Sequence, residues 1–120
     1  MLGRNTDVAK WIKVCRRDEV PAGDKVCAAA AENGVVLCDS AGRLHAVANV
    51  CPHAGLPIGE GDLHGRVLIC PFHGYAYDIH TGRNIDFPHE EPGVRTYPVK
   101  IEQGCVWVDL EADVRAEAME

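Results

Sequence analysis

The chain has 120 residues, of which 47% are hydrophobic and 25% are charged, and its formal net charge at pH 7 is −6. This size and composition are typical of a single globular domain. The negative charge argues against binding to nucleic acid, and no apolar run approaches the ~18 residues that a membrane span needs. The first residues, MLGRNTDVAKWIK, contain no apolar segment typical of a secretion signal, so we expect a cytoplasmic protein.

Short runs of apolar and β-branched residues alternate along the chain with turns rich in Gly, Pro, Asn and Asp, which is typical of an all-β protein. Asn33-Gly34 indicates a hairpin, because both positions tolerate positive φ. The alanine run at 28–31 would also suit a helix. In chain order, strands are predicted at 11–15, 25–30, 35–39, 44–50, 67–70, 75–79, 94–101 and 105–110.

The segments between these strands read as turns, and the longest, the proline-broken 84–93, reads as a loop. We find no internal repeat and no second domain. The predicted organisation is an N-terminal extension (1–10), one domain (11–110) and an acidic C-terminal tail (111–120). Many short strands with regular turns predict an antiparallel sandwich or barrel.

The six cysteines fall into two groups. Without a secretion signal, a disulfide framework is a weaker interpretation than metal binding or catalysis. Two cysteines, Cys51 and Cys70, have histidines at metal-ligand spacing. The other four lie in apolar segments and are interpreted as small buried hydrophobic residues: Cys15, Cys27, Cys38 and Cys105.

Two phrases carry the chemistry: CPHAGLPIG at 51–59 and CPFHGYAYD at 70–78. Each offers one cysteine and one histidine, as Cys51-x-His53 and Cys70-x-x-His73. A structural zinc site fits poorly, because its usual order places two cysteines on one knuckle and two histidines on the other. A Cys/His nucleophile would leave the second pair idle, with no oxyanion-stabilising arrangement visible. A [2Fe–2S] cluster with two cysteine and two histidine ligands uses all four residues.

These phrases resemble the two cluster-binding loops of the Rieske family, and the resemblance extends over roughly residues 11–110, including VRTYPVKIEQGCVWV near the end. It implies an all-β fold with a small cluster-binding lobe. It also implies one [2Fe–2S] cluster per chain, in which Cys51 and Cys70 bind one iron and His53 and His73 bind the other. The remaining histidines, which lack a cysteine at ligand spacing, are interpreted as surface or turn residues: His45, His64, His80 and His89.

The resemblance also bears on the reduction potential. Replacing two thiolates by neutral imidazoles makes the centre less negative and raises its potential into the range of roughly −150 to +300 mV. The high-potential branch of the family has a cysteine pair where this chain has Leu56 and Phe72, and a serine where it has Tyr75; Tyr77 matches a tyrosine that can bond a ligand sulfur. With fewer donors to the sulfurs, we expect a potential below about 0 mV. Leu56 and Phe72 are predicted to pack together and seal the loops, or to be core residues.

The family resemblance implies an electron carrier rather than an enzyme. The first hypothesis is a ferredoxin that passes electrons from a flavoprotein reductase to a terminal ring-hydroxylating oxygenase, as a monomer or in transient complexes. The alternative is the small subunit of an assimilatory NADH-dependent nitrite reductase, bound to its large subunit. A complete oxygenase would need a mononuclear iron domain, for which the 47 residues after His73 leave no room.

Overall fold

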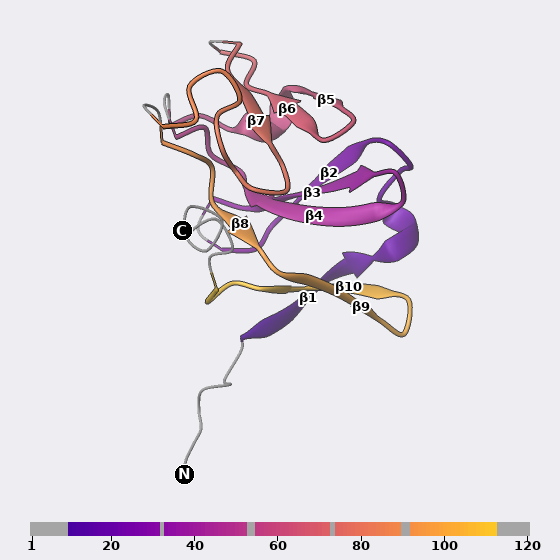
Figure 1. Cartoon of the computed structure of the whole chain (residues 1–120). Coiled ribbons are helices and arrows are strands. Elements are labelled where there is room, and N and C mark those ends of the chain that lie inside the picture. Colours follow the sequence, from indigo (N-terminus) through magenta and orange to yellow (C-terminus); the bar gives the residue numbers. More distant parts are fainter. Residues whose placement is uncertain (1–9, 32, 53–54, 73, 90–91, 113–120) are drawn as a thin grey trace.

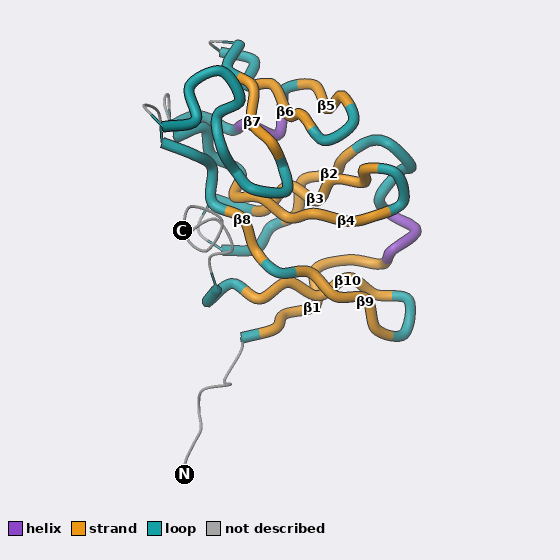
Figure 2. The backbone as a smooth tube through the Cα atoms, in the orientation of Figure 1, coloured by secondary structure: helices purple, strands orange, loops and turns teal. Residues whose placement is uncertain are grey.

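The computed structural model describes residues 10–31, 33–52, 55–72, 74–89 and 92–112. Within them, strands joined by turns and two single-turn 3₁₀ helices, Arg17–Glu19 and Ile58–Glu60, account for the regular structure (Figures 1 and 2), which confirms the all-β prediction. Neither of these helices is long and apolar enough to cross a membrane. The strands are β1 (Trp11–Arg16), β2 (Lys25–Ala28), β3 (Val35–Ser40), β4 (Arg43–Ala48), β5 (Asp62–His64), β6 (Val67–Ile69), β7 (Ala76–Asp78), β8 (Thr96–Tyr97), β9 (Val99–Glu102) and β10 (Cys105–Asp109).

The two ends of the described chain meet in one antiparallel sheet of order β1-β10-β9. In β10, Val106 and Val108 are buried and Trp107 between them is half-buried, as alternation predicts, although Asp109 at the end of the strand is buried as well. The pairing of β1 with β10 contains an irregularity between Lys13 and Cys15. Pro98 separates β8 from β9, so the single strand predicted at 94–101 is two short strands, because proline cannot donate a ladder hydrogen bond.

The second sheet, of order β2-β3-β4-β8, lies in the middle of the molecule in Figure 1. Its central strand β3 is buried from Val35 to Asp39. The hairpin between β2 and β3 is confirmed, but its loop is longer than expected, because the last pair is Ala28 with Val35. Positive φ is found at Ala31 and Gly34 and not at Asn33, so only one of the two positions that indicated the hairpin uses this conformation. The strand stops at Ala28 because the following alanines have little preference for extended structure.

The third sheet, β5-β6-β7, forms a separate lobe above the second sheet in Figure 1. Strand β5 was not predicted, since Asp62 and His64 made the segment look like a loop and turn. Strand β6 ends immediately before Cys70, and β7 begins at Ala76. The loop that starts at Cys70 therefore connects two paired strands, β6 and β7.

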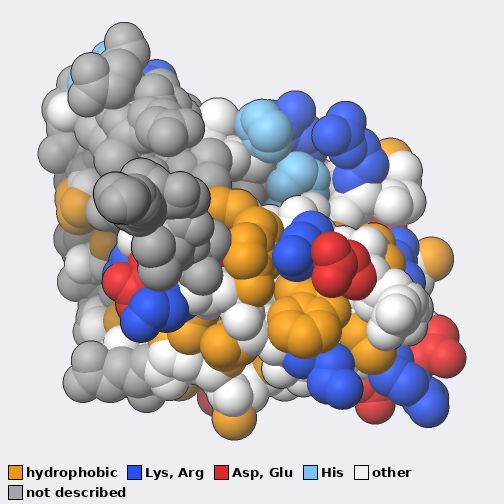
Figure 3. Space-filling model, turned by 90° about the horizontal axis from the view of Figure 1, so that it is seen from below, with side chains coloured by type: hydrophobic (Ala, Val, Ile, Leu, Met, Phe, Trp, Pro, Cys, Tyr) orange, Lys and Arg blue, Asp and Glu red, His pale blue; other side chains and the backbone are white. Residues whose placement is uncertain are grey.

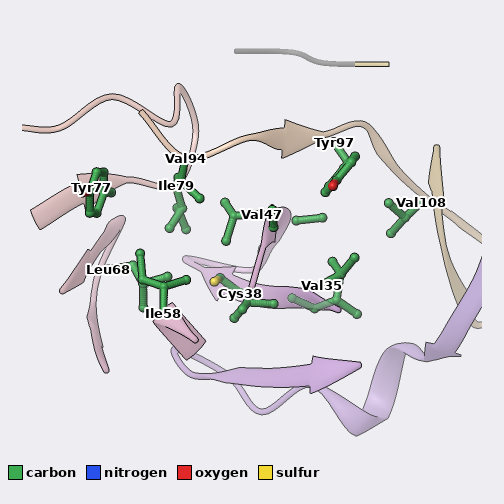
Figure 4. Packing of buried hydrophobic residues seen from close by; sticks show 14 of the residues in the cluster. Val35, Cys38, Val47, Ile58, Leu68, Tyr77, Ile79, Val94, Tyr97 and Val108 are labelled. Carbon is green, nitrogen blue, oxygen red and sulfur yellow. The ribbon is translucent and has the colours of Figure 1, made fainter. Parts of the chain in front are cut away.

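One hydrophobic cluster links the three sheets. Figure 4 shows it extending from Leu68 and Tyr77 in the third sheet, past Val47 and Cys38, to Val108 in the first. The largest fully buried apolar side chains are those of Tyr77, Leu37, Ile58, Leu68, Ile79, Val35, Val36, Val47, Val94, Val106 and Val108. The lobe that carries the motifs is therefore anchored in the main core and is not an independent unit.

The predicted terminal segments lie almost wholly outside the described residues. Of the extension 1–10 only Lys10 is described, and its backbone N–H donates to Asp109 Oδ1 over 3.3 Å. Of the tail 111–120 only Glu111 and Ala112 are described. The division into extension, domain and tail stays a prediction.

Candidate metal centre

The two motif cysteines are both fully buried. Cys51 follows β4 after a short connection, and Cys70 follows β6 directly; each has no solvent-exposed surface. No disulfide joins any of the six cysteines, all of which are among the described residues. Two thiols held away from water at the start of two loops are suited to bind metal as thiolates, because burial keeps solvent from competing for the ligand positions.

The two loops are closed by the same pair of backbone hydrogen bonds. The N–H of Cys51 donates to the carbonyl of Leu56 over 2.7 Å, and the N–H of Gly55 donates back to the Cys51 carbonyl over 2.7 Å. In the second loop the N–H of Cys70 donates to the carbonyl of Tyr75 over 2.8 Å, and the N–H of Gly74 donates to the Cys70 carbonyl over 2.9 Å. The two loops are therefore copies of one local structure, although they differ in cysteine–histidine spacing.

A glycine four residues after each cysteine makes this closure possible. Gly55 and Gly74 both have φ of +73°, in the left-handed region that other residues adopt only at a cost. Nothing lies within 4 Å of the position that a Cβ would occupy at either glycine, so the requirement is conformational and not steric. The positive φ at these two glycines is what lets each loop turn back on its cysteine.

Two contacts fix the bases of the loops: a hydrogen bond closes the first loop, and a close backbone approach joins it to the second. Asn49, just before the first loop, accepts a hydrogen bond at its Oδ1 from the N–H of Gly59, just after it, over 2.8 Å. A Cβ at Gly61 would collide with the backbone carbonyl of Ile69, the residue before Cys70. Neither Asn49 nor Gly61 was singled out from the sequence. Asn49 lay inside the predicted strand 44–50, and a glycine needed for close packing has no local signature.

Tyr77 connects the core to the first cysteine. Its side chain is 1% exposed, and its hydroxyl oxygen lies 3.8 Å from the sulfur of Cys51. Burial, and then the bond to Cys51 and the charge that Cys51 and Cys70 can carry, raise the pKa of Tyr77 well above its usual value. The phenol therefore keeps its proton and can donate it toward a Cys51 thiolate, which confirms the predicted sulfur contact.

Of the four predicted ligands, the two histidines, His53 and His73, lie outside the described residues. No group of three or more His, Cys, Asp or Glu side chains suited to a metal ion occurs in the part of the chain that the structure describes, which holds only the cysteine half of the set. That half fits a mixed sulfur and nitrogen site: two buried thiols on two equivalent loops, with a phenol hydroxyl beside one sulfur.

The remaining cysteines are partly as predicted. Cys38 is fully buried, and burial raises the pKa of its thiol to about 12, so it is an inert core residue. Cys15 and Cys105 are half-buried, and Cys27 is exposed. The prediction of a buried Cys27 is wrong because β2 is at an edge of its sheet, where a neighbouring strand flanks its side chains on one side only.

Leu56 and Phe72 are not core residues: their side chains are 43% and 41% exposed. They stand on the two loops, one on each, and Ile85 and Phe87 are exposed to a similar degree. The ring of Phe87 packs edge-on against Tyr75 of the second loop, with centroids 6.4 Å apart. Leu56 and Phe72 are therefore too exposed to seal the loops against water in the way that was predicted.

The comparisons with known proteins agree with these features. Residues 10–98 match the family model of the Rieske [2Fe-2S] domain. The chain belongs to the Rieske family. Its resident cofactor is one [2Fe–2S] cluster, and the paired Cys/His loops are the feature by which the sequence already resembled this family.

Three Rieske proteins are close matches along most of their length. The chain is 35% identical over 101 residues to the ferredoxin component of the naphthalene 1,2-dioxygenase system of Pseudomonas aeruginosa, covering 84% of this chain and 96% of that protein. A chain in the complex of reduced oxygenase and oxidized ferredoxin of carbazole 1,9a-dioxygenase superposes with a TM-score of 0.74 and 26% identity, covering 82% of this chain and 92% of that one. A protein of Mycobacterium tuberculosis proposed to be an NADH-dependent nitrite reductase small subunit also gives 0.74 and 26%, covering 85% and 96%.

Proposed function

We propose that Cys51 and Cys70 bind one iron of the [2Fe–2S] cluster and that His53 and His73 bind the other. Support comes from the buried cysteines, the two equivalent loops and the presence of one histidine within three residues of each cysteine. When bound, the cluster supplies one-electron transfer. The chain supplies two thiolates that are shielded from water and the Tyr77 hydroxyl beside Cys51.

The ligand set can be tested by substitution with matched controls. Cys51→Ser and Cys70→Ser should remove most of the bound iron, and Cys27→Ser, which changes an exposed cysteine, should retain it. His53→Gln should likewise lose cluster, whereas His89→Gln should not. Iron and acid-labile sulfide per purified chain are the measurements. Retention of full iron content in Cys51→Ser or His53→Gln would contradict the ligand proposal.

The function that the site supports best is that of a one-electron carrier, the ferredoxin component of an oxygenase system. In this role it accepts electrons from a flavoprotein reductase and passes them to a terminal ring-hydroxylating oxygenase. The observation that carries the proposal is the match of most of the chain to almost the whole of a dioxygenase ferredoxin component. The exposed apolar side chains on the two cluster loops suit brief docking, because a small apolar contact can form and separate quickly.

The carrier role is tested by reconstitution. The holoprotein, an NADH-dependent flavoprotein reductase and a terminal oxygenase of the ring-hydroxylating class should together support NADH-dependent product formation, and omission of this chain should abolish most of it. Turnover that is unchanged without this chain, with a reductase that does reduce it, would contradict the proposal.

The alternative role is that of a nitrite reductase small subunit, and the structural match to the Mycobacterium tuberculosis protein favours it. In that case the chain would be isolated bound to a large sirohaem protein. A monomer that diffuses between two partners supports the carrier. Size-exclusion chromatography of the natively expressed protein separates the two.

We also propose a cytoplasmic location. Six cysteines without a disulfide suit a reducing compartment. Fractionation of cells that express the native gene is the direct test.

A further inference from the structure

A hollow with a mixed apolar and polar lining lies on the side of the second sheet that faces His80, the residue two positions beyond the end of β7. Its volume is about 190 Å³, and its lining includes Arg43, His45, His80 and Thr96. A second hollow of about 320 Å³ shares three of these residues and adds Ser40 and Arg66. None of these residues belongs to the two cluster loops, so the electron-carrier role does not account for the hollow.

The sheet register places the side chains of three lining residues, Arg43, His45 and Thr96, on one face of the sheet. Arg43, His45 and Val47 alternate along β4 and therefore point the same way. Thr96 of β8 stands directly opposite Val47 in the antiparallel register, so its side chain leaves the sheet on that same face. His80 approaches from the third sheet, and its ring meets that of His45 edge-on with centroids 5.5 Å apart.

The hollow is basic in a protein whose net charge is −6. Two arginines line the joined hollows, and one carboxylate, Asp78, lies nearby. Asp78 accepts two hydrogen bonds from Arg66 Nη2, over 3.1 and 3.0 Å, and one from the His80 N–H over 2.7 Å. Arg43 has no carboxylate partner among the described residues. Figure 3 shows histidine side chains beside lysine and arginine side chains on one face of the molecule.

Thr96 gives the second, independent indication. The residue is 3% exposed, and its hydroxyl makes no hydrogen bond with any described group. A buried hydroxyl without a partner costs free energy, and one that lines a hollow with water-sized room is expected to bond to something within it. Hydroxyl, guanidinium and protonated imidazole groups share the ability to donate to an anionic oxygen.

We propose that this hollow is a binding site for a small tetrahedral oxyanion, held by Arg43, His45 and His80 with the Thr96 hydroxyl at its inner end. Such an anion could be free sulfate or phosphate, or the phosphate end of a larger molecule. It would supply a counter-charge to Arg43, which has no carboxylate partner in the described part of the chain, and an acceptor to the buried Thr96 hydroxyl. The two hollows together leave room for a group attached to the anion.

Sulfate is the sharpest probe, because its charge is constant between pH 5 and 8. Isothermal titration calorimetry on the holoprotein at constant ionic strength should show one sulfate per chain. Arg43→Gln should weaken binding roughly tenfold, as expected for loss of a charged hydrogen bond. Arg16→Gln removes the same charge from an exposed arginine outside the hollow and should leave the affinity within about twofold.

Thr96→Val separates binding from folding. The substitution removes a hydroxyl that bonds to no described group, so the variant should unfold at the same or a higher denaturant concentration than the wild type. Its sulfate affinity should nevertheless fall by roughly fivefold, because a neutral hydrogen bond to the anion is lost. Unchanged affinity in Thr96→Val, or equal weakening in Arg43→Gln and Arg16→Gln, would overturn the proposal.

The pH dependence of the sulfate affinity is a further test of the proposal. Burial lowers the pKa of His45, and the positive charges of His80, Arg66 and Arg43 lower it further, against the opposing effect of Asp78. A bound anion favours the protonated imidazole, so sulfate should bind more tightly as the pH falls through the lowered pKa of His45. His45→Gln should remove most of this dependence. A wild-type affinity that is flat from pH 8 to pH 5 would contradict the role of the imidazoles.

Phosphate and a phosphomonoester, titrated in parallel, distinguish a free ion from a larger ligand: tighter binding of the monoester supports the larger ligand.

Discussion

At the scale of single residues, the contact between Tyr77 and Cys51 is the feature most able to tune the centre. The hydroxyl keeps its proton because burial and the neighbouring sulfurs raise its pKa. A donor near a ligand sulfur stabilises the more negative, reduced state and so raises the reduction potential. The positions of the additional cysteine pair in the high-potential branch are here Leu56 and Phe72, whose exposed side chains add no hydrogen-bond donor.

Tyr77→Phe is therefore expected to lower the potential. Loss of one hydrogen bond of about 1 kcal/mol corresponds to roughly 40 mV for a one-electron couple. The wild-type potential itself should lie below about 0 mV. Protein-film voltammetry measures both values. Tyr97→Phe, which removes a hydroxyl from a buried tyrosine in the second sheet, is the control and should leave the potential unchanged; an equal shift in both variants would rule out the sulfur contact as the cause.

Gly61 is the residue on which the spacing of the two loops depends. A methyl group there would meet the carbonyl of Ile69, which is backbone and cannot rotate away. Gly61→Ala should lower the free energy of unfolding by at least about 2 kcal/mol, as overpacking does, and should reduce cluster content. Gly23→Ala is the control, because Gly23 has positive φ but open space around it, and it should cost only about 1 kcal/mol. Denaturant titration followed by cluster absorbance and circular dichroism measures both effects.

At the scale of elements, Asp39 ties two turns to the end of the central strand β3. Its carboxylate accepts hydrogen bonds from Arg17 Nη2 over 2.6 Å and from the backbone N–H groups of Gly23 and Gly42 over 3.2 and 3.1 Å. The bond to Arg17 in particular, together with those from Gly23 and Gly42, lowers the pKa of Asp39 against the opposing effect of burial. The carboxylate is thus a fixed junction between β1, β2 and β3.

This junction predicts a dependence of stability on pH. Because the folded-state pKa of Asp39 is depressed, its contribution is fully present above the unfolded value of about 3.9 and is lost as the pH falls through the lower folded value. Asp39→Asn should unfold more easily by about 2 kcal/mol at pH 7, and the difference from the wild type should shrink below about pH 4. Denaturant unfolding of both proteins between pH 7 and pH 3 measures this difference. A constant gap at all pH values would contradict the assignment.

The sequence predicted those elements whose structure is determined by neighbouring residues, and it missed those that depend on distant parts of the chain. The hairpins of the second sheet and the Cys70 loop follow from turn residues and alternation, and they were predicted. Strand β5 was missed because its polar residues conceal a pairing that β6 provides. The exposure of Cys27 and the exposure of Leu56 depend on which strand is an edge and which loop is at the surface, and those are properties of the assembled fold. The four predicted ligands came from the spacing of the two Cys/His phrases and from their resemblance to the Rieske family, whereas Gly61 and Asn49 needed coordinates.

At the scale of the whole molecule, charge and apolar surface are distributed for short-lived contact. The net charge is −6, yet the large exposed hydrophobic side chains include one on each cluster loop, Leu56 and Phe72. A partner would approach under long-range attraction to the acidic surface and would then exclude water over these side chains.

Phe72→Ala should accordingly slow electron transfer to a partner oxygenase several-fold by weakening docking, with the potential unchanged. Ile101→Ala is a matched control: its side chain is 49% exposed, but it lies on β9, in the sheet at the other end of the molecule from the cluster loops in Figure 1. Stopped-flow mixing of the reduced carrier with the oxidised oxygenase measures the rates. Equal slowing in both variants would contradict docking through the loops.

The central claim, a diiron centre held by two sulfur and two nitrogen ligands, is tested most directly by electron spin resonance of the reduced holoprotein with resolution of nitrogen hyperfine coupling. We predict two irons and two sulfides per chain and coupling of the unpaired spin to two imidazole nitrogens, both lost in His53→Gln. A reduced protein without nitrogen coupling, or one that contains zinc in place of iron, would contradict it.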